Sequence, residues 1–236
     1  MSFHQKPFTR VGTVDIVQAM TQPTTDTKMG AGNGQRRRLL IGTSNKGKLH
    51  EMLEVLGVLP FQFVTPTDLG ISTDAPEDFD TYVENAIQKA EFYRQSSGGL
   101  LTLAEDSGIV VDALEGELGV KTRRWGAGEK ASDEEWIEYF LKRMEQVAEP
   151  KRTATFLCTA VVLGEDSQPH VFVGETRGII THELQAPIKV GIPISSCFIP
   201  EGFDQVYAAL SVEQKNKVSH RGKAMHKVKD FLETLA

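Results

Sequence analysis

The sequence predicts a mixed α/β fold built around a long, twisted sheet, and three observations lead to this prediction. From residue 38 onward, short apolar or β-rich runs alternate with segments of helical periodicity. Two long β-rich runs, residues 153–163 and 170–178, flank a polar turn and should pair as a hairpin. Ser132, followed three residues later by Glu135, forms a capping-box pattern that predicts the start of a helix.

The remaining elements follow from the same patterns. Residues 38–42 and 61–64 are apolar runs that predict buried strands, and apolar side chains at helical spacing join them. A second helix is predicted from the apolar positions between residues 79 and 90. Residues 100–104 and 109–111 predict two short strands that flank a turn at residues 106–108. A last helix is predicted over residues 219–235.

Composition narrows the class of protein. Of the 236 residues, 40 % are hydrophobic and 25 % are charged, which is ordinary for a soluble globular protein. The net charge of −6 argues against sequence-blind binding to nucleic acid. No run reaches the roughly 20 apolar residues of a membrane helix. The two cysteines are too few for a disulfide framework, which favours a reducing cytoplasm. We expect a flexible tail over residues 1–37 and one domain over residues 38–236.

Four segments carry candidate chemistry, and the first lies between the first strand and the first helix. It contains Thr43, Ser44, Asn45 and Lys48. A strand-to-helix turn directs free backbone N–H groups toward a ligand, and small polar residues allow a phosphate to approach. Lys48 would add a positive charge. A simple helix cap with exposed lysines explains this segment equally well.

The second segment places Glu105 and Asp106 next to each other, with Ser107 and Gly108 following. Adjacent carboxylates at the end of an apolar strand are costly unless they are solvated, paired or bound to a metal. Carboxylate oxygens suit Mg²⁺, which usually bridges to substrate phosphates. The alternative is an ordinary turn, because Asp-Ser-Gly is favourable turn chemistry.

Charged residues also surround the second predicted helix and open the last one. Glu77 precedes the second helix, and Glu84 and Lys89 lie on it, where a solvated face is the alternative explanation. The segment that opens the last helix contains Lys215, Ser219, His220 and Arg221. This last set suits recognition of a base edge and phosphates, although Ser219 also suits a helix cap.

Together, in order and spacing, these segments resemble the inosine/xanthosine triphosphate pyrophosphatase family over residues 39–235. The resemblance implies two lobes around a central cleft, a homodimer, and Mg²⁺-dependent attack of water between the α and β phosphates. It implies catalytic roles for Lys48, Lys89 and Asp106, and a metal set of Glu77, Glu84, Glu105 and Asp106. It also implies a substrate-binding set of Thr43, Ser44, Asn45, Lys48, Lys89, Ser107, Ser195, Phe198, Lys215, Ser219, His220 and Arg221.

One family segment is altered here, at residues 191–198. Ile192 offers no aromatic face for stacking on a purine, and Ser195 replaces an acidic acceptor with a neutral hydroxyl. We therefore expect hydrolysis of a purine nucleoside triphosphate, with a base preference moved away from a strict inosine/xanthosine choice. Two other readings stay open: a nucleotide-binding sensor without turnover, and a pyrophosphatase for modified pyrimidine nucleotides.

Overall fold

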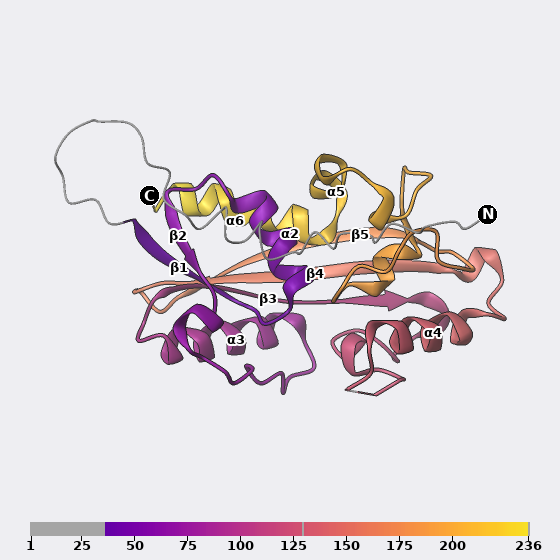
Figure 1. The fold of residues 1–236 in the computed structure, drawn as a ribbon, viewed down its shortest axis with the longest axis horizontal. Helices are drawn as coiled ribbons and strands as arrows, with labels where there is room; N and C mark the ends of the chain where they lie inside the picture. Colours follow the sequence, from indigo (N-terminus) through magenta and orange to yellow (C-terminus); the bar gives the residue numbers. More distant parts are fainter. Residues whose placement is uncertain (1–35, 129, 236) are drawn as a thin grey trace, which may run out of the picture. The chain divides into compact units, whose positions relative to one another are not determined.

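The computed structural model describes residues 36–128 and 130–235, so the tail predicted over residues 1–37 lies almost entirely outside the described residues. Within these residues the chain forms a six-stranded sheet in the order β2-β1-β3-β4-β5-β6 (Figure 1). The first three of these strands pair in parallel, and the others pair antiparallel. The sheet is therefore mixed, as predicted.

The elements largely follow the predicted order. The strands are β1 (Arg37–Gly42), β2 (Phe61–Val64), β3 (Leu101–Val111), β4 (Thr153–Leu163), β5 (Pro169–Ile180) and β6 (Phe198–Pro200). The helices are α2 (Lys46–Leu56), α3 (Tyr82–Ser96), α4 (Asp133–Met144), α5 (Val212–Val218) and α6 (His220–Glu233). The capping box at Ser132 and Glu135 is confirmed, and so is the β4–β5 hairpin. The sequence patterns missed α5 and β6, which are both short.

The predicted turn at residues 106–108 is wrong, because these residues continue the long strand β3. Every residue from Thr102 to Val111 pairs with a residue of β4. The ladder of inter-strand hydrogen bonds outweighs the turn propensity of Asp-Ser-Gly. Gly108 also packs closely, since an added Cβ would lie 2.3 Å from the Gly119 carbonyl oxygen.

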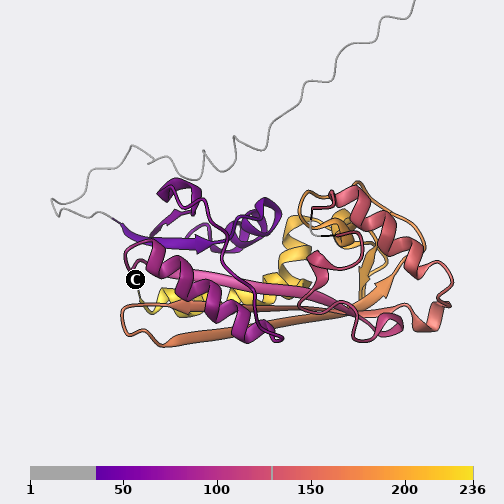
Figure 2. The ribbon, with the colours of Figure 1, turned by 90° about the horizontal axis from the view of Figure 1, so that it is seen from below.

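Helices cover both faces of the sheet. Figure 1 shows α2 and α6 on one side and α3 on the other, and Figure 2 shows the molecule from below, with α3 lying along the sheet. Among the described residues, the two largest apolar clusters lie at opposite ends of the long strands. One joins β1 and β2 to α2 and α6, and the other joins α4 and β6 to the far half of β3. These two clusters are the cores of the two predicted lobes.

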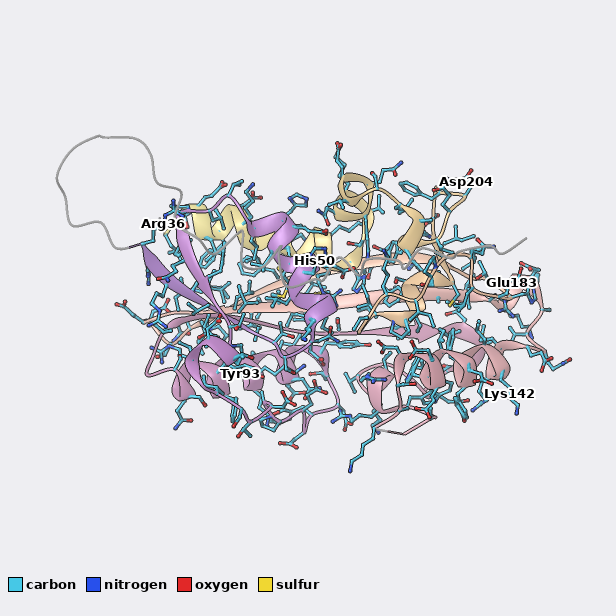
Figure 3. All side chains as sticks on the ribbon, viewed as in Figure 1. Arg36, His50, Tyr93, Lys142, Glu183 and Asp204 are labelled. Atoms are coloured by element: carbon cyan, nitrogen blue, oxygen red, sulfur yellow. The ribbon has the colours of Figure 1, made fainter. Side chains whose placement is uncertain are left out.

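The sheet opens between these lobes. β1 ends at Gly42, which pairs with Ala104, while β3 continues past this point for seven more residues. Tyr93 of α3, labelled in Figure 3, closes the base of the opening, because a Cβ on Gly42 would lie 2.5 Å from the Tyr93 ring. The carboxyl end of a parallel strand beside such an opening is a common place for a ligand. No helix among the described residues is long and apolar enough to cross a membrane.

Candidate active site

A cavity of about 710 Å³ lies at this opening, and both lobes contribute to its walls. Its volume is in the range of small-molecule sites. The charged part of the wall includes Lys48, Glu77, Lys89, Arg124, Lys215 and Arg221. The apolar part includes Trp136, Phe156, Ile192, Pro193 and Ile194. Such a cavity combines a region suited to a polyanion with a region suited to a flat, weakly polar group.

The strand-to-helix loop forms one end of the charged wall. Thr43, Ser44, Asn45 and Lys48 all line the cavity. Asn45 is the N-cap of α2, and its side-chain oxygen accepts a hydrogen bond from the Lys48 backbone N–H at 3.0 Å. The Asn45 N–H in turn donates to the Thr43 hydroxyl at 3.2 Å. The loop is thus a helix cap that also faces the cavity, so the two interpretations of this segment are compatible.

Glu105 is buried against α2 and α6, where it balances two cations. Its side chain is 0 % exposed and lies 2.9 Å from the Lys48 ammonium and 3.6 Å from the Arg221 guanidinium. The Cys158 thiol donates a hydrogen bond to the other carboxylate oxygen at 3.3 Å. Burial raises the pKa of Glu105, but the charges of Lys48 and Arg221 outweigh it and hold this pKa well below its usual range. Glu105 therefore stays ionised and orders the cations of this wall.

Asp106 points to the opposite face of the sheet, because successive side chains of a strand alternate. The Lys89 ammonium donates to Asp106 at 3.0 Å and also pairs with Glu77, so two carboxylates share one cation. The Asn85 amide donates to the second Asp106 oxygen at 3.2 Å. Burial raises the pKa of Asp106, and the nearby Glu77 charge adds to this effect.

The two carboxylates beside Lys89 consequently differ in basicity. Burial raises the pKa of Glu77, but Lys89 outweighs it and leaves the pKa of Glu77 lowered. Burial lowers the pKa of Lys89, yet Asp106 and Glu77 more than compensate, so Lys89 stays protonated. Environments that separate the pKa values of two neighbouring acids are typical of sites that transfer protons. The pKa of Asp106 is thus shifted upward and that of Glu77 downward from their ordinary values.

The same pair is the part of the predicted metal set that fits Mg²⁺. Among the described residues, no three His, Cys, Asp or Glu side chains converge as a complete metal site. Mg²⁺ commonly uses one or two carboxylates together with water and substrate phosphates, so Glu77 and Asp106 meet its needs. The structure does not bring the other two predicted ligands to this pair. Glu105 is buried on the opposite face, and exposed Glu84 accepts a hydrogen bond from the Thr81 hydroxyl at 2.6 Å.

The last predicted segment lies across α5 and α6. Lys215 and Arg221 both form ion pairs with Glu51 of α2, and Arg221 donates to the Ser107 hydroxyl at 2.8 Å. Burial raises the pKa of Glu51, but its cationic neighbours outweigh this and lower it to about 2. The Ser219 hydroxyl accepts from the Gly222 N–H at 3.0 Å as the N-cap of α6. Ser219 therefore positions the helix that carries Arg221.

His220 forms a stack with aromatic side chains at the apolar end. Its ring lies 4.6 Å from the Phe156 ring centroid at an interplanar angle of 13°. Burial lowers the pKa of His220 well below its usual value, so the imidazole is neutral. Its Nδ1 atom is buried without a hydrogen-bond partner among the described residues. A neutral imidazole of this kind can donate from one nitrogen and accept at the other.

The altered segment faces the same end of the cavity. Residues 193–196 form a short 3₁₀ turn, and the Ser195 hydroxyl lines the cavity while donating to the Ile192 carbonyl at 2.7 Å. Its proton is thus already in use, and the hydroxyl can only accept from a ligand. Phe198 is 0 % exposed and packs edge-on against Phe156 at 4.8 Å, so it supports the aromatic wall from behind.

The structure therefore gathers most of the predicted residues and adds others. Glu84, Asp106, Phe198 and Ser219 are not among the residues that line the cavity, and Asp106 reaches it only through its hydrogen bond with Lys89. Glu51 and Phe156 line the cavity as well, although neither was among the predicted site residues. A buried-face glutamate three residues after Lys48 was a usable signal for Glu51, because that spacing places both on one side of a helix. Phe156 gave no signal, since an aromatic residue in a strand is ordinary.

Comparisons with known proteins identify the family of the chain. The family model of the Ham1 family matches residues 39–231. A protein named dITP/XTP pyrophosphatase from Geobacter sulfurreducens is 39 % identical over 196 residues, which cover 83 % of this chain and 96 % of the relative.

Solved structures give the same result. The structure of a HAM1 protein from Coxiella burnetii has a TM-score of 0.72 at 31 % identity and covers 84 % of this chain and 99 % of its own. The Staphylococcus aureus Ham1 protein has a TM-score of 0.69 at 31 % identity, with 85 % and 100 % covered. The family resemblance expected from the motifs is confirmed: this chain belongs to the Ham1 family.

Proposed function

We propose that this protein hydrolyses a non-standard purine nucleoside or deoxynucleoside triphosphate to its monophosphate and pyrophosphate. The observation that carries the proposal is one cavity that joins a cationic wall to an apolar aromatic wall, with the buried Asp106 hydrogen-bonded to Lys89 of the cationic wall. The printed names of the relatives, dITP/XTP pyrophosphatase, support the same reaction class.

The residues divide the work between binding and chemistry. Lys48, with the N–H groups of its loop, and Lys89 would hold the phosphates. The buried base Asp106 would accept a proton from water as the water oxygen bonds to phosphorus. The bond from that phosphorus to the bridging oxygen between the α and β phosphates breaks, and pyrophosphate leaves. Mg²⁺ held by Glu77 and Asp106 would neutralise phosphate charge and orient the chain of phosphates.

The apolar end would receive the base. Ile192 and Phe156 offer surfaces for its faces, while neutral His220 and the acceptor oxygen of Ser195 offer polar contacts at its edge. The wall has no acidic acceptor at position 195, which supports a base preference other than a strict inosine/xanthosine choice. A broadened or redirected purine preference follows from this chemistry.

We also propose a homodimer in a reducing compartment. Val110, Val171, Val173 and Ile179 are 38–42 % exposed, and the strand register puts them on the same face of the sheet. The solvent-exposed face of an antiparallel sheet normally carries polar side chains. Exposed aliphatic side chains on this face therefore suit contact with a second copy of the chain. The two cysteines, Cys158 and Cys197, are buried and free. Sedimentation analysis giving a monomer would contradict the dimer.

The function is tested by pyrophosphate release from a panel of triphosphates in the presence of Mg²⁺. The panel contains ITP, XTP, dITP, the standard nucleotides, modified purines and modified pyrimidines. Fast release from one or a few purines supports the proposal and names the base. Binding without release would favour a sensor, and a preference for modified pyrimidines would favour the third reading. Hydrolysis of ITP and XTP far faster than of all others would refute the altered base preference.

A further inference from the structure

The turn at residues 189–192, which opens the altered segment, is held from both sides. Gly191 donates its N–H to a carboxylate oxygen of Asp133 at 2.6 Å. Its carbonyl accepts a hydrogen bond from the Asn45 side-chain amide at 3.0 Å. Asp133 is the first residue of α4, and Asn45 caps α2. Gly191, which lines the cavity, therefore connects the N-terminal ends of α2 and α4.

On the α2 side, the link reaches the proposed phosphate loop directly. The Asn45 side chain uses its oxygen to accept from the Lys48 N–H and its nitrogen to donate to Gly191. Both bonds fix the orientation of the same amide group. Gly47 adds a close contact, because an added Cβ there would lie 2.3 Å from the Val190 carbonyl oxygen. The Asn45 side chain thus contacts both the turn and the loop, and its bond to the Lys48 N–H does not involve Asp133.

On the α4 side, Asp133 holds the turn with a charge-assisted hydrogen bond. Its side chain is 15 % exposed, and its second oxygen lies 3.9 Å from the Arg123 guanidinium at the cavity wall. Hydrogen bonds from a backbone N–H to a carboxylate are stronger than those between neutral groups. Asp133 itself is not part of the cavity wall, so it acts on a ligand through Gly191.

The backbone of the turn permits no side chain at its centre. Gly191 has a φ of +76°, in the left-handed region that favours glycine. A Cβ at this position would lie 2.5 Å from the Asn45 side-chain oxygen. The tight fit means that the two hydrogen bonds and the glycine act as one unit, which we term the Gly191 clasp (Asn45, Asp133 and Gly191).

We infer that Asp133 is a specificity-determining positioning residue, which holds the base-facing segment in register with the phosphate loop through the Gly191 clasp. This inference rests on the proposed function, since it assumes that Ile192 and Ser195 face a base. Loss of Asp133 would free the turn, so the base contacts would weaken while the phosphate contacts at Lys48 and Lys89 would remain.

Calorimetric binding of two probes tests the inference without requiring turnover. Inosine monophosphate reports base contacts, and inorganic tripolyphosphate reports phosphate contacts. For Asp133→Ala we expect about 10- to 100-fold weaker binding of inosine monophosphate. This is the loss expected when a hydrogen bond to a charged group is removed. Tripolyphosphate binding should change less than about 3-fold, since the Asp133 side chain pairs with Arg123 and Gly191 and contacts neither Lys48 nor Lys89.

Two further variants separate a positioning role from a general loss of structure. Asp133→Asn keeps an acceptor oxygen and should restore most of the inosine monophosphate affinity. Glu134→Ala removes an exposed carboxylate from the same helix turn and should leave both probes unchanged. Equal weakening of both probes by Asp133→Ala, or no weakening of either, would overturn the inference.

A second perturbation approaches the clasp from its centre. Gly191→Ala should weaken inosine monophosphate to a similar extent, because the added Cβ displaces the Asn45 amide. Wild-type affinity in this variant would also overturn the inference. The triphosphate panel decides the proposed reaction, whereas these affinities decide the clasp, so the two failures are distinguishable.

Discussion

Replacing Asp106 with asparagine tests the proposed proton acceptor. Asparagine keeps the size of the side chain, its oxygen still accepts a hydrogen bond from Lys89, and Glu77 continues to balance that ammonium, so only the hydrogen bond donated by the Asn85 amide is lost. The fold should therefore survive. What is lost is the carboxylate charge, which serves both the proposed base and the proposed Mg²⁺ site; a positioned general base alone contributes about 10²–10⁴-fold to a rate. This corresponds to about 3–5 kcal/mol in activation free energy.

The assay is pyrophosphate release at saturating substrate, with thermal unfolding measured in parallel. Asp106→Asn should lower kcat by about 10²–10⁴-fold. Asp80→Asn is the matched control, because Asp80 is exposed on the loop before α3 and forms no ion pair or hydrogen bond among the described residues. Its kcat should equal that of the wild type. If Asp106→Asn kept more than about a third of the wild-type kcat, Asp106 would not be the base.

The pH profile gives an independent check on the same residue. Burial raises the pKa of Asp106 above its ordinary value of 3.8. A base must be deprotonated to act, so kcat/KM of the wild type should rise with pH through this elevated pKa. The residual activity of Asp106→Asn should lack that acid limb. An identical acid limb in both proteins would assign the titration to another group.

Three further perturbations address the surrounding charges. Lys89→Ala should lower kcat/KM by about 10²–10³-fold, as for other preorganised electrostatic groups. It should also move the acid limb of the pH profile to higher pH, because the Lys89 charge lowers the pKa of Asp106. An unmoved acid limb would argue against the Lys89–Asp106 pair. Glu105→Gln should reduce the free energy of unfolding by about 3–5 kcal/mol, because buried Arg221 and half-buried Lys48 lose a shared buried counter-ion and Arg221 keeps only Glu51. Exposed Glu84→Gln should change it by less than about 0.5 kcal/mol. Glu51 has a folded pKa of about 2 against 4.5, so its stabilisation is present above pH 4.5 and is lost as the pH falls toward 2. Urea unfolding at several pH values should show this fall in the free energy of unfolding. In Glu51→Gln the free energy of unfolding should depend less on pH over this range.

The periodic elements were predictable because their burial patterns are local. A short apolar run located β1, helical spacing located α2, and two β-rich runs around a polar turn located the β4–β5 hairpin. The serine–glutamate pair located the start of α4. The short helix α5 was missed, since seven residues offer too few turns for a clear apolar face.

The sequence indicated most of the residues that form the candidate site, but not how they lie relative to one another. Residues 106–108 were predicted to form a turn, whereas they belong to the continuous strand β3. Successive side chains of a strand point to opposite faces, so Glu105 and Asp106 lie on opposite faces of the sheet. These two adjacent carboxylates were therefore grouped as one metal set, although only Asp106 meets Glu77. Contacts such as Asp133 with Gly191, 58 residues apart, depend on tertiary packing and leave no local pattern.

The most direct test of the account is the identity of the products that the wild-type protein releases from a purine nucleoside triphosphate. Anion-exchange chromatography of a single-turnover reaction would resolve them. The account predicts nucleoside monophosphate and pyrophosphate in equal amounts, with both absent for Asp106→Asn over the same time. Release of nucleoside diphosphate and inorganic phosphate instead would contradict cleavage between the α and β phosphates.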